Sequence, residues 1–180
     1  MRRTEQELKD ASGHVKYEID MLVGTMSFLS KPAAETHWIA SSAYLESLVL
    51  HLRNLIDFFY TPSTRDDIVA EHFVAQWTAD CPVMSPLLDD AKERANKLCA
   101  HLTYTRLHMD KTWEWAAIWA ELKQVIRCFV SHLPAERKPW FADASLEEPS
   151  GPTGTSSLPV VRGWTGPPGP PDPEKAKTSE

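Results

Sequence analysis

Apolar residues between positions 45 and 59 recur every three or four residues, and this spacing constrains the fold more than any other feature. The stripe consists of Leu45, Leu48, Val49, Leu52, Leu55, Ile56 and Phe59. Because an α-helix has 3.6 residues per turn, these positions lie on one helix face, which must be buried against other elements. We therefore predict a helix that begins after Pro32 and ends at about Tyr60.

The N-terminal segment shows the same period and a clear start signal. Thr4-Glu-Gln-Glu7 has the form of a capping box, in which the threonine and glutamate side chains bind each other's backbone amides. We predict a helix from this box to about Leu29. Its expected core face consists of Leu8, Val15, Ile19, Leu22, Val23 and Met26.

Ser85 and Pro86 predict the start of another helix, because serine is a good N-cap and proline suits the first helical position. Its expected core stripe consists of Leu87, Leu88, Ala91, Ala95, Leu98, Leu102 and Thr105. This helix is therefore expected to continue past Thr105.

Two more helical segments complete the pattern. A short one covers Asp66 to Trp77, with Ile68, Val69, Phe73 and Trp77 directed inward. A longer one follows Asp110 as its cap and ends before Pro134. Its expected core face consists of Trp115, Ile118, Trp119, Leu122, Val125, Ile126 and Phe129.

Long helices joined by short loops favour antiparallel neighbours, so we predict an all-α, up-and-down four-helix bundle with one short extra helix. This domain covers residues 1–144, of which those after Leu133 form a short irregular extension. Most of the glycine and more than half of the proline lie between Pro149 and Pro173, without apolar periodicity. We predict a disordered tail over residues 145–180.

Composition limits the functional classes. A chain of 180 residues with a formal net charge of −6 has room for one domain and does not attract nucleic acid or anionic membranes as a whole. Its three cysteines lack the CxxC spacing of redox or zinc sites. No signal-peptide core and no apolar run long enough for a membrane span is present in the sequence, so we predict a cytoplasmic protein that does not enter the membrane.

The polar residues from position 94 to 108 are the strongest candidates for a catalytic site. Arg94, His101 and His108 are spaced by seven residues, so they would share a face of the predicted helix, with Lys97 and Tyr104 one turn away. A neutral histidine can act as a general base, and a guanidinium can stabilise charge that develops on a phosphoryl oxygen. This combination is suited to the cleavage of an RNA phosphodiester by its own 2′-hydroxyl.

The segment Arg94-x6-His101 resembles the signature of the HEPN superfamily, in which a histidine follows an arginine within a helical bundle. The resemblance implies a metal-independent endoribonuclease or RNA-binding bundle without a cofactor, often dimeric, from a toxin–antitoxin or phage-defence system. It implies that Arg94 and His101 are catalytic, and that an antitoxin-like protein is a partner. The neighbouring polar side chains would bind RNA, namely Asn96, Lys97, Tyr104, Arg106 and His108.

His51, Arg53 and Asn54 interrupt the stripe of the second predicted helix. If this helix packs against the fourth, His51 or Asn54 could approach His101 and help to bind the substrate. Alternatively, the three residues are a structural cluster, in which Arg53 pairs with Asp57 and the histidine sets the helix register.

A non-catalytic helical interaction module is the competing hypothesis for the whole chain. Arg94 would then pair with Asp90, one turn earlier, on an ordinary surface. Trp77 and Trp113 would be candidate anchors for a protein partner. A metal site is not predicted, because the sequence contains neither Glu-x-x-His nor His-x-x-x-His.

Overall fold

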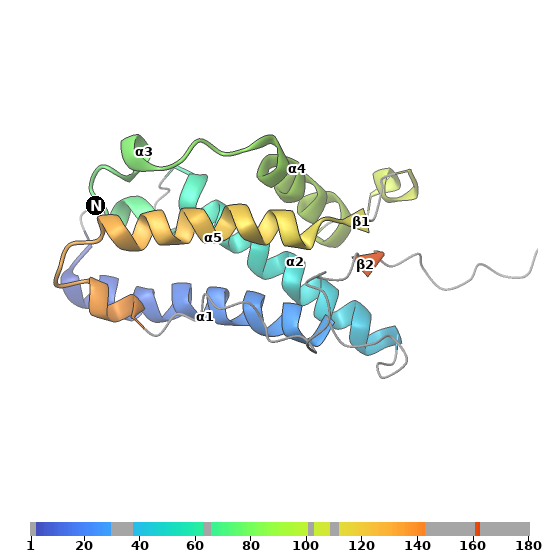
Figure 1. Cartoon of the computed structure of the whole chain (residues 1–180), viewed down its shortest axis with the longest axis horizontal. Helices are drawn as coiled ribbons and strands as arrows, with labels where there is room; N and C mark the ends of the chain where they lie inside the picture. The colour runs from blue at the N-terminus through green and yellow to red at the C-terminus, as the bar shows by residue number, and fades with distance from the viewer. Residues whose placement is uncertain are drawn as a thin grey trace, which may run out of the picture.

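Four main helices pack against one another in the computed structural model, which confirms the predicted all-α fold. They are α1 (Glu5–Leu29), α2 (Trp38–Tyr60), α4 (Pro86–Ala95) and α5 (Trp115–His132). Successive main helices run in alternating directions, as the colours in Figure 1 show. The structure describes residues 3–29, 38–62, 66–100, 103–108, 112–142 and 161–162.

Shorter elements connect these helices. They are η2 (Ala70–His72), η4 (Tyr104–Leu107) and η5 (Lys138–Phe141), which are 3-10 turns, the helical turn α3 (Trp77–Asp80) and the π-helical turn η3 (Asn96–Ala100). Two-residue strands β1 (Thr112–Trp113) and β2 (Val161–Arg162) pair in antiparallel fashion. Of the predicted tail, only β2 belongs to the described residues.

The predicted starts of α1 and α4 are confirmed. The Thr4 amide donates to Glu7 Oε2 at 2.7 Å, and the Glu7 amide donates to Thr4 Oγ1 at 3.2 Å. Ser85 Oγ accepts from the Leu88 amide at 3.2 Å. The cap predicted for α5, Asp110, lies outside the described residues, and Glu114 precedes that helix without a side-chain cap.

The hydrophobic core contains every residue predicted for the core faces of α1, α2 and α5. At its centre, aromatic rings meet edge to face, for example those of Phe58 and Phe129, whose ring centres are 5.3 Å apart. The Trp77 indole also lies in this core and donates to the Phe59 carbonyl at 2.8 Å. Apolar periodicity alone therefore predicted which helix faces are buried.

The fourth helix is much shorter than predicted. α4 ends at Ala95 and is followed by the turns η3 and η4 instead of a continuous helix. The Thr103 hydroxyl and Arg106 Nε both donate to the Lys97 carbonyl at 3.3 Å. Side chains that bind nearby carbonyls compete with the backbone bonds of a helix. These contacts give a physical reason why the helical spacing does not produce a helix here.

The prediction of a short third helix over residues 66–77 is also wrong in its extent. Only η2 and the first residue of α3 are helical in this range. Val69 and Phe73 are buried as predicted, but Ile68 is 39% exposed. Val69 has extended backbone angles, and neighbouring side chains on an extended segment point in opposite directions.

Neither tryptophan predicted as a partner anchor is exposed, since Trp77 and Trp113 are 1% and 2% accessible. Trp113 stacks on Trp115, with ring centres 5.0 Å apart. Both therefore belong to the core, which for Trp77 confirms the inward position predicted for it.

Candidate functional site

Arg94, the predicted phosphate-binding residue, connects α4 to the segment that precedes α5. Its guanidinium carbon lies 4.5 Å from the centre of the Trp113 ring, and Nη2 donates to the Thr112 carbonyl. Nη1 lies 3.5 Å from the Asp90 carboxylate, which confirms the alternative pairing. Because only 13% of the side chain is exposed, Arg94 has a clear structural role.

His101, the predicted base, lies outside the described residues. The geometry of the Arg94 and His101 pair is therefore untested, and its catalytic role stays a prediction. The α-helical face predicted to join Arg94 and His108 is absent, because α4 ends at Ala95 and His108 follows the 3-10 turn η4.

The other residues predicted to bind RNA have different surroundings. Asn96 is the C-cap of α4, and the Lys97 carbonyl accepts the two bonds described above. Arg106 Nη2 also donates to the Cys99 carbonyl at 3.4 Å, so this guanidinium holds its own loop. Tyr104 and His108, by contrast, are exposed.

His51 and Asn54 are directed toward α1, not toward α4. His51 Nδ1 lies 2.7 Å from Glu18 Oε2, and Asn54 Nδ2 donates to the same oxygen at 3.0 Å. The His51 ring also meets the ring of Tyr17 edge to face. This arrangement favours the alternative that these residues set the register of α1 against α2.

Arg53 belongs to a second network, on the side of α2 that faces α4. Its Nε lies 3.7 Å from Asp57 Oδ2, which confirms the predicted pair. Lys92 Nζ from α4 lies 2.6 Å from Asp57 Oδ1, and the Thr61 hydroxyl donates to that oxygen at 3.0 Å. Asp57 therefore links α2 to α4, and sequence spacing revealed only its partner on the same helix.

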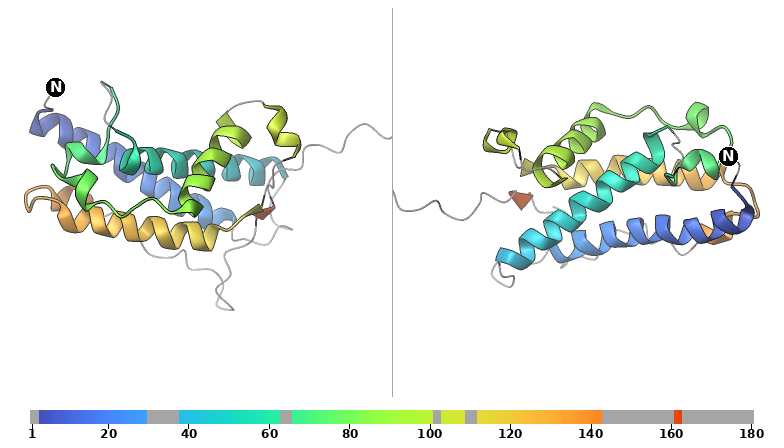
Figure 2. Two further views of the ribbon diagram at one scale, coloured as in Figure 1. Left: turned by 90° about the horizontal axis from the view of Figure 1, so that it is seen from above. Right: turned by 180° about the vertical axis from the view of Figure 1, so that it is seen from behind.

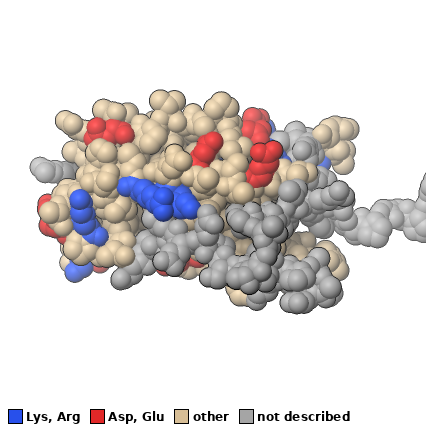
Figure 3. All heavy atoms as spheres, viewed as in Figure 1, with Lys and Arg blue, Asp and Glu red and all other residues tan. Residues whose placement is uncertain are grey.

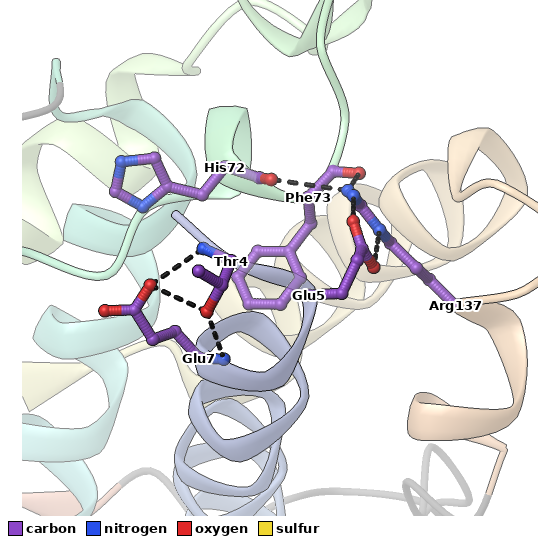
Figure 4. A network of polar contacts seen from close by, with 6 residues as sticks. All are labelled: Thr4, Glu5, Glu7, His72, Phe73 and Arg137. Carbon is purple, nitrogen blue, oxygen red and sulfur yellow. Dashed lines mark hydrogen bonds and ion pairs between the residues drawn. The ribbon is translucent and has the colours of Figure 1, made fainter. Parts of the chain in front are cut away.

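A third polar network, which the sequence analysis missed, surrounds the start of α1 (Figure 4). Arg137 donates to both oxygens of Glu5 and also to the carbonyls of His72 and Phe73. Burial, with Arg3 nearby, lowers the pKa of His72. Because the Arg137 guanidinium has these intramolecular acceptors, the network attaches the segment after α5 to α1.

Large apolar side chains are exposed at one end of the molecule, and we call this region the apolar end. It consists of Phe28 (43% exposed), Trp38 (59%), Ile39 (55%), Tyr104 (90%) and Leu107 (72%). The start of α2 extends beyond the end of α1 here, and η4 lies at the same end (Figures 1 and 2). The sequence does not indicate this region, because Trp38 lies one heptad before Leu45, at a position that fits the core stripe.

The charges of the described residues do not form one large basic area on the face seen in Figure 3. Lys and Arg side chains lie among Asp and Glu side chains. Arg53, Arg94 and Arg137 each contact a carboxylate of the protein itself. This distribution agrees with the net charge of −6 and provides little attraction for a polyanion.

The three cysteines are free thiols. Burial raises the pKa of Cys81 to about 11, and it also raises the pKa values of Cys99 and Cys128. The reactive form of cysteine is the thiolate. At neutral pH these thiols are therefore poor nucleophiles.

Two further features bear on the class of function. Within the described ranges, no three histidine, cysteine or acidic side chains are grouped so that they could hold a metal ion. None of the described helices combines the length and apolar character that crossing a bilayer requires.

Comparisons of the chain with protein-family models, with curated proteins and with solved structures find no match. They therefore add no support to the HEPN resemblance.

Proposed function

We propose that this chain is a non-catalytic helical module that binds a protein partner through its apolar end. The observation that carries the proposal is the exposure of large side chains there, above all Trp38 and Ile39. Large apolar side chains exposed side by side, as Trp38 and Ile39 are at the start of α2, often mark interaction sites, and tryptophan is enriched among the residues that dominate binding energy. A second copy of the chain is the first partner to test.

The surroundings of the predicted catalytic arginine also support this proposal. Arg94 is mostly buried and contacts Asp90, Thr112 and Trp113. A phosphate group would have to compete with these contacts. Because its guanidinium already contacts acceptors of the protein, Arg94 is less available to a phosphoryl oxygen.

RNA binding or cleavage, as the HEPN resemblance implies, is the second candidate function. The observation that favours it is the 90% exposure of Tyr104, with His108 exposed close by in sequence. Exposed aromatic rings stack on unpaired bases. Under this hypothesis Arg94 and His101 would perform the cleavage, dimerisation would bring the pair of a second protomer opposite the first, and an antitoxin-like protein would be a partner.

A site-specific photo-crosslinker at position 39 tests the protein-binding proposal. We expect protein adducts from this position, and few from position 83, because Val83 is 93% exposed but lies outside the apolar end. Sedimentation of the purified chain shows whether a second copy is the partner. The double substitution Trp38→Ser and Ile39→Ser should abolish the complex, whereas Val83→Ser should preserve it. Equal crosslinking from both positions would contradict the proposal.

RNA incubation in EDTA tests the second candidate. RNA cleavage is compared between the wild-type protein and His101→Ala. RNA binding is compared between Tyr104→Ala and a control, Tyr17→Ala, which also removes an exposed ring. Our proposal predicts no cleavage and no effect of Tyr104→Ala on RNA binding. Cleavage that disappears in His101→Ala would replace our proposal with the ribonuclease hypothesis.

A further inference from the structure

A cavity of about 340 Å³ opens between α1, the C-terminal half of α2 and the segment that leads into η2. Binding pockets for small molecules usually begin at about 300 Å³. The cavity is separate from the apolar end, which contains the first turn of α2. Any ligand bound here would therefore be additional to the protein partner proposed above.

Its lining combines an apolar part with carboxylates. Val15, Phe58 and Val69 supply buried apolar surface, while Glu18 and Asp67 supply negative charge. Among the described lining residues there is no lysine or arginine. Such a lining favours a molecule with both a hydrocarbon part and a positive charge.

Glu18 is held in a defined position at this cavity. Its Oε2 accepts a hydrogen bond from Asn54 at 3.0 Å and lies 2.7 Å from His51 Nδ1. Both partners come from α2, so the carboxylate is fixed from the neighbouring helix. Among the described residues its other oxygen, Oε1, has no hydrogen-bond partner. A preorganised acceptor of this kind loses little entropy when it binds a donor.

Asp57, a third carboxylate of the lining, differs from Glu18. Lys92 Nζ lies 2.6 Å from its Oδ1, and Arg53 Nε lies 3.7 Å from its Oδ2. These cations already balance its charge. Glu18, by contrast, contacts His51 and Asn54 but no lysine or arginine among the described residues, so it is the main carboxylate for a cationic ligand.

We infer that this cavity binds a small organic ammonium ion, which donates a hydrogen bond to Glu18 and places its hydrocarbon part against Phe58. An anion would be repelled by the carboxylates of the lining. A neutral molecule would lack the Coulomb attraction between an ammonium ion and the Glu18 carboxylate.

Benzylamine, which is protonated at neutral pH, is a suitable probe, with benzyl alcohol and benzoate as neutral and anionic controls. We expect saturable NMR shifts of amides in residues 14–18, 54–58 and 66–69 with benzylamine only. Glu18→Gln retains an oxygen that can accept from Asn54, so it should fold and still weaken binding about tenfold, the equivalent of about 1.4 kcal/mol. Asp67→Asn should weaken binding less.

Asp20→Asn is the matched control, because Asp20 is an exposed carboxylate on α1 that does not line the cavity. It should bind benzylamine as wild type does. The inference is overturned if wild type shows no saturable shift, if benzyl alcohol binds equally well, or if Glu18→Gln and Asp20→Asn behave alike. None of these results affects the apolar end, so this test is independent of the crosslinking experiment.

Discussion

The helix α2 and the segment from residue 96 to residue 108 have similar apolar spacing in sequence but different structures. α2 is one continuous helix of 23 residues, and every predicted core position on it is buried. The segment from residue 96 contains a π-helical turn, a 3-10 turn and exposed Tyr104 and Leu107. Similar apolar spacing therefore does not ensure a continuous α-helix.

Two physical differences separate these regions. α2 packs against both α1 and α4, so its large stripe residues gain buried area on two sides. The stripe of the second region includes Thr105 and is accompanied by polar side chains that bind carbonyls of the same segment. Short polar side chains that bind the nearby backbone favour turns over helices.

The largest expected effect comes from shortening a buried side chain in α2. Leu52→Ala should cost about 2–5 kcal/mol of unfolding free energy, because the cavity left by leucine is only partly filled by relaxation. Leu98→Ala, in η3, should cost clearly less, since Leu98 is only partly buried. Urea denaturation of both variants measures the difference. Equal losses would mean that the segment after α4 belongs to the core as fully as α2 does.

Arg94→Ala should have the next largest effect, a loss of about 1–3 kcal/mol, because a hydrogen bond, an ion pair and a ring contact disappear together. Arg127→Ala serves as control, since Arg127 is exposed on α5, and it should be nearly neutral. Thermal and urea unfolding report both changes. A purely catalytic role for Arg94 predicts the opposite, namely unchanged stability.

Arg106→Ala should loosen only the segment from residue 96 to residue 108. The Lys97 and Cys99 carbonyls lose one hydrogen bond each, which corresponds to about 0.5–1.5 kcal/mol per bond. Hydrogen exchange should become faster for amides of this segment and stay unchanged in α2. If exchange in α2 increases as well, the two regions unfold as one unit.

The smallest expected effect is a pH dependence of stability that comes from His72. This residue belongs to the network that contacts the start of α1. Because burial lowers its pKa below the ordinary value of 6.5, the unfolded chain binds this proton more readily than the folded one. Stability should therefore decrease as the pH falls below about 6.5, and this part of the loss should be absent in His72→Gln. An NMR titration of the imidazole that gives a pKa above 6.5 would contradict the assignment.

Sequence analysis was accurate where one local rule determines the outcome. The capping box at Thr4, the N-cap at Ser85 and the pairs of Arg53 with Asp57 and Arg94 with Asp90 involve residues within one helical turn. Local geometry is enough to predict such contacts.

The candidate site was less predictable, because its contacts join residues far apart in the chain. Nothing in the spacing indicates that His51 and Asn54 meet Glu18, or that Lys92 meets Asp57. Arg94 likewise contacts Thr112 and Trp113, which no helical period relates to it. Such contacts depend on how whole helices are positioned.

The sequence by itself determined the all-α class, the starts of α1 and α4, and the buried faces of α1, α2 and α5, because these follow from backbone period and local hydrogen bonding. Only the tertiary structure decided where α4 ends, why Trp113 is buried, and which apolar side chains remain exposed at the apolar end. A stripe residue such as Trp38 has the same sequence signature whether or not a neighbouring helix reaches it. Whether an apolar side chain is buried depends on the surface that packs against it, and that surface forms only when the helices pack.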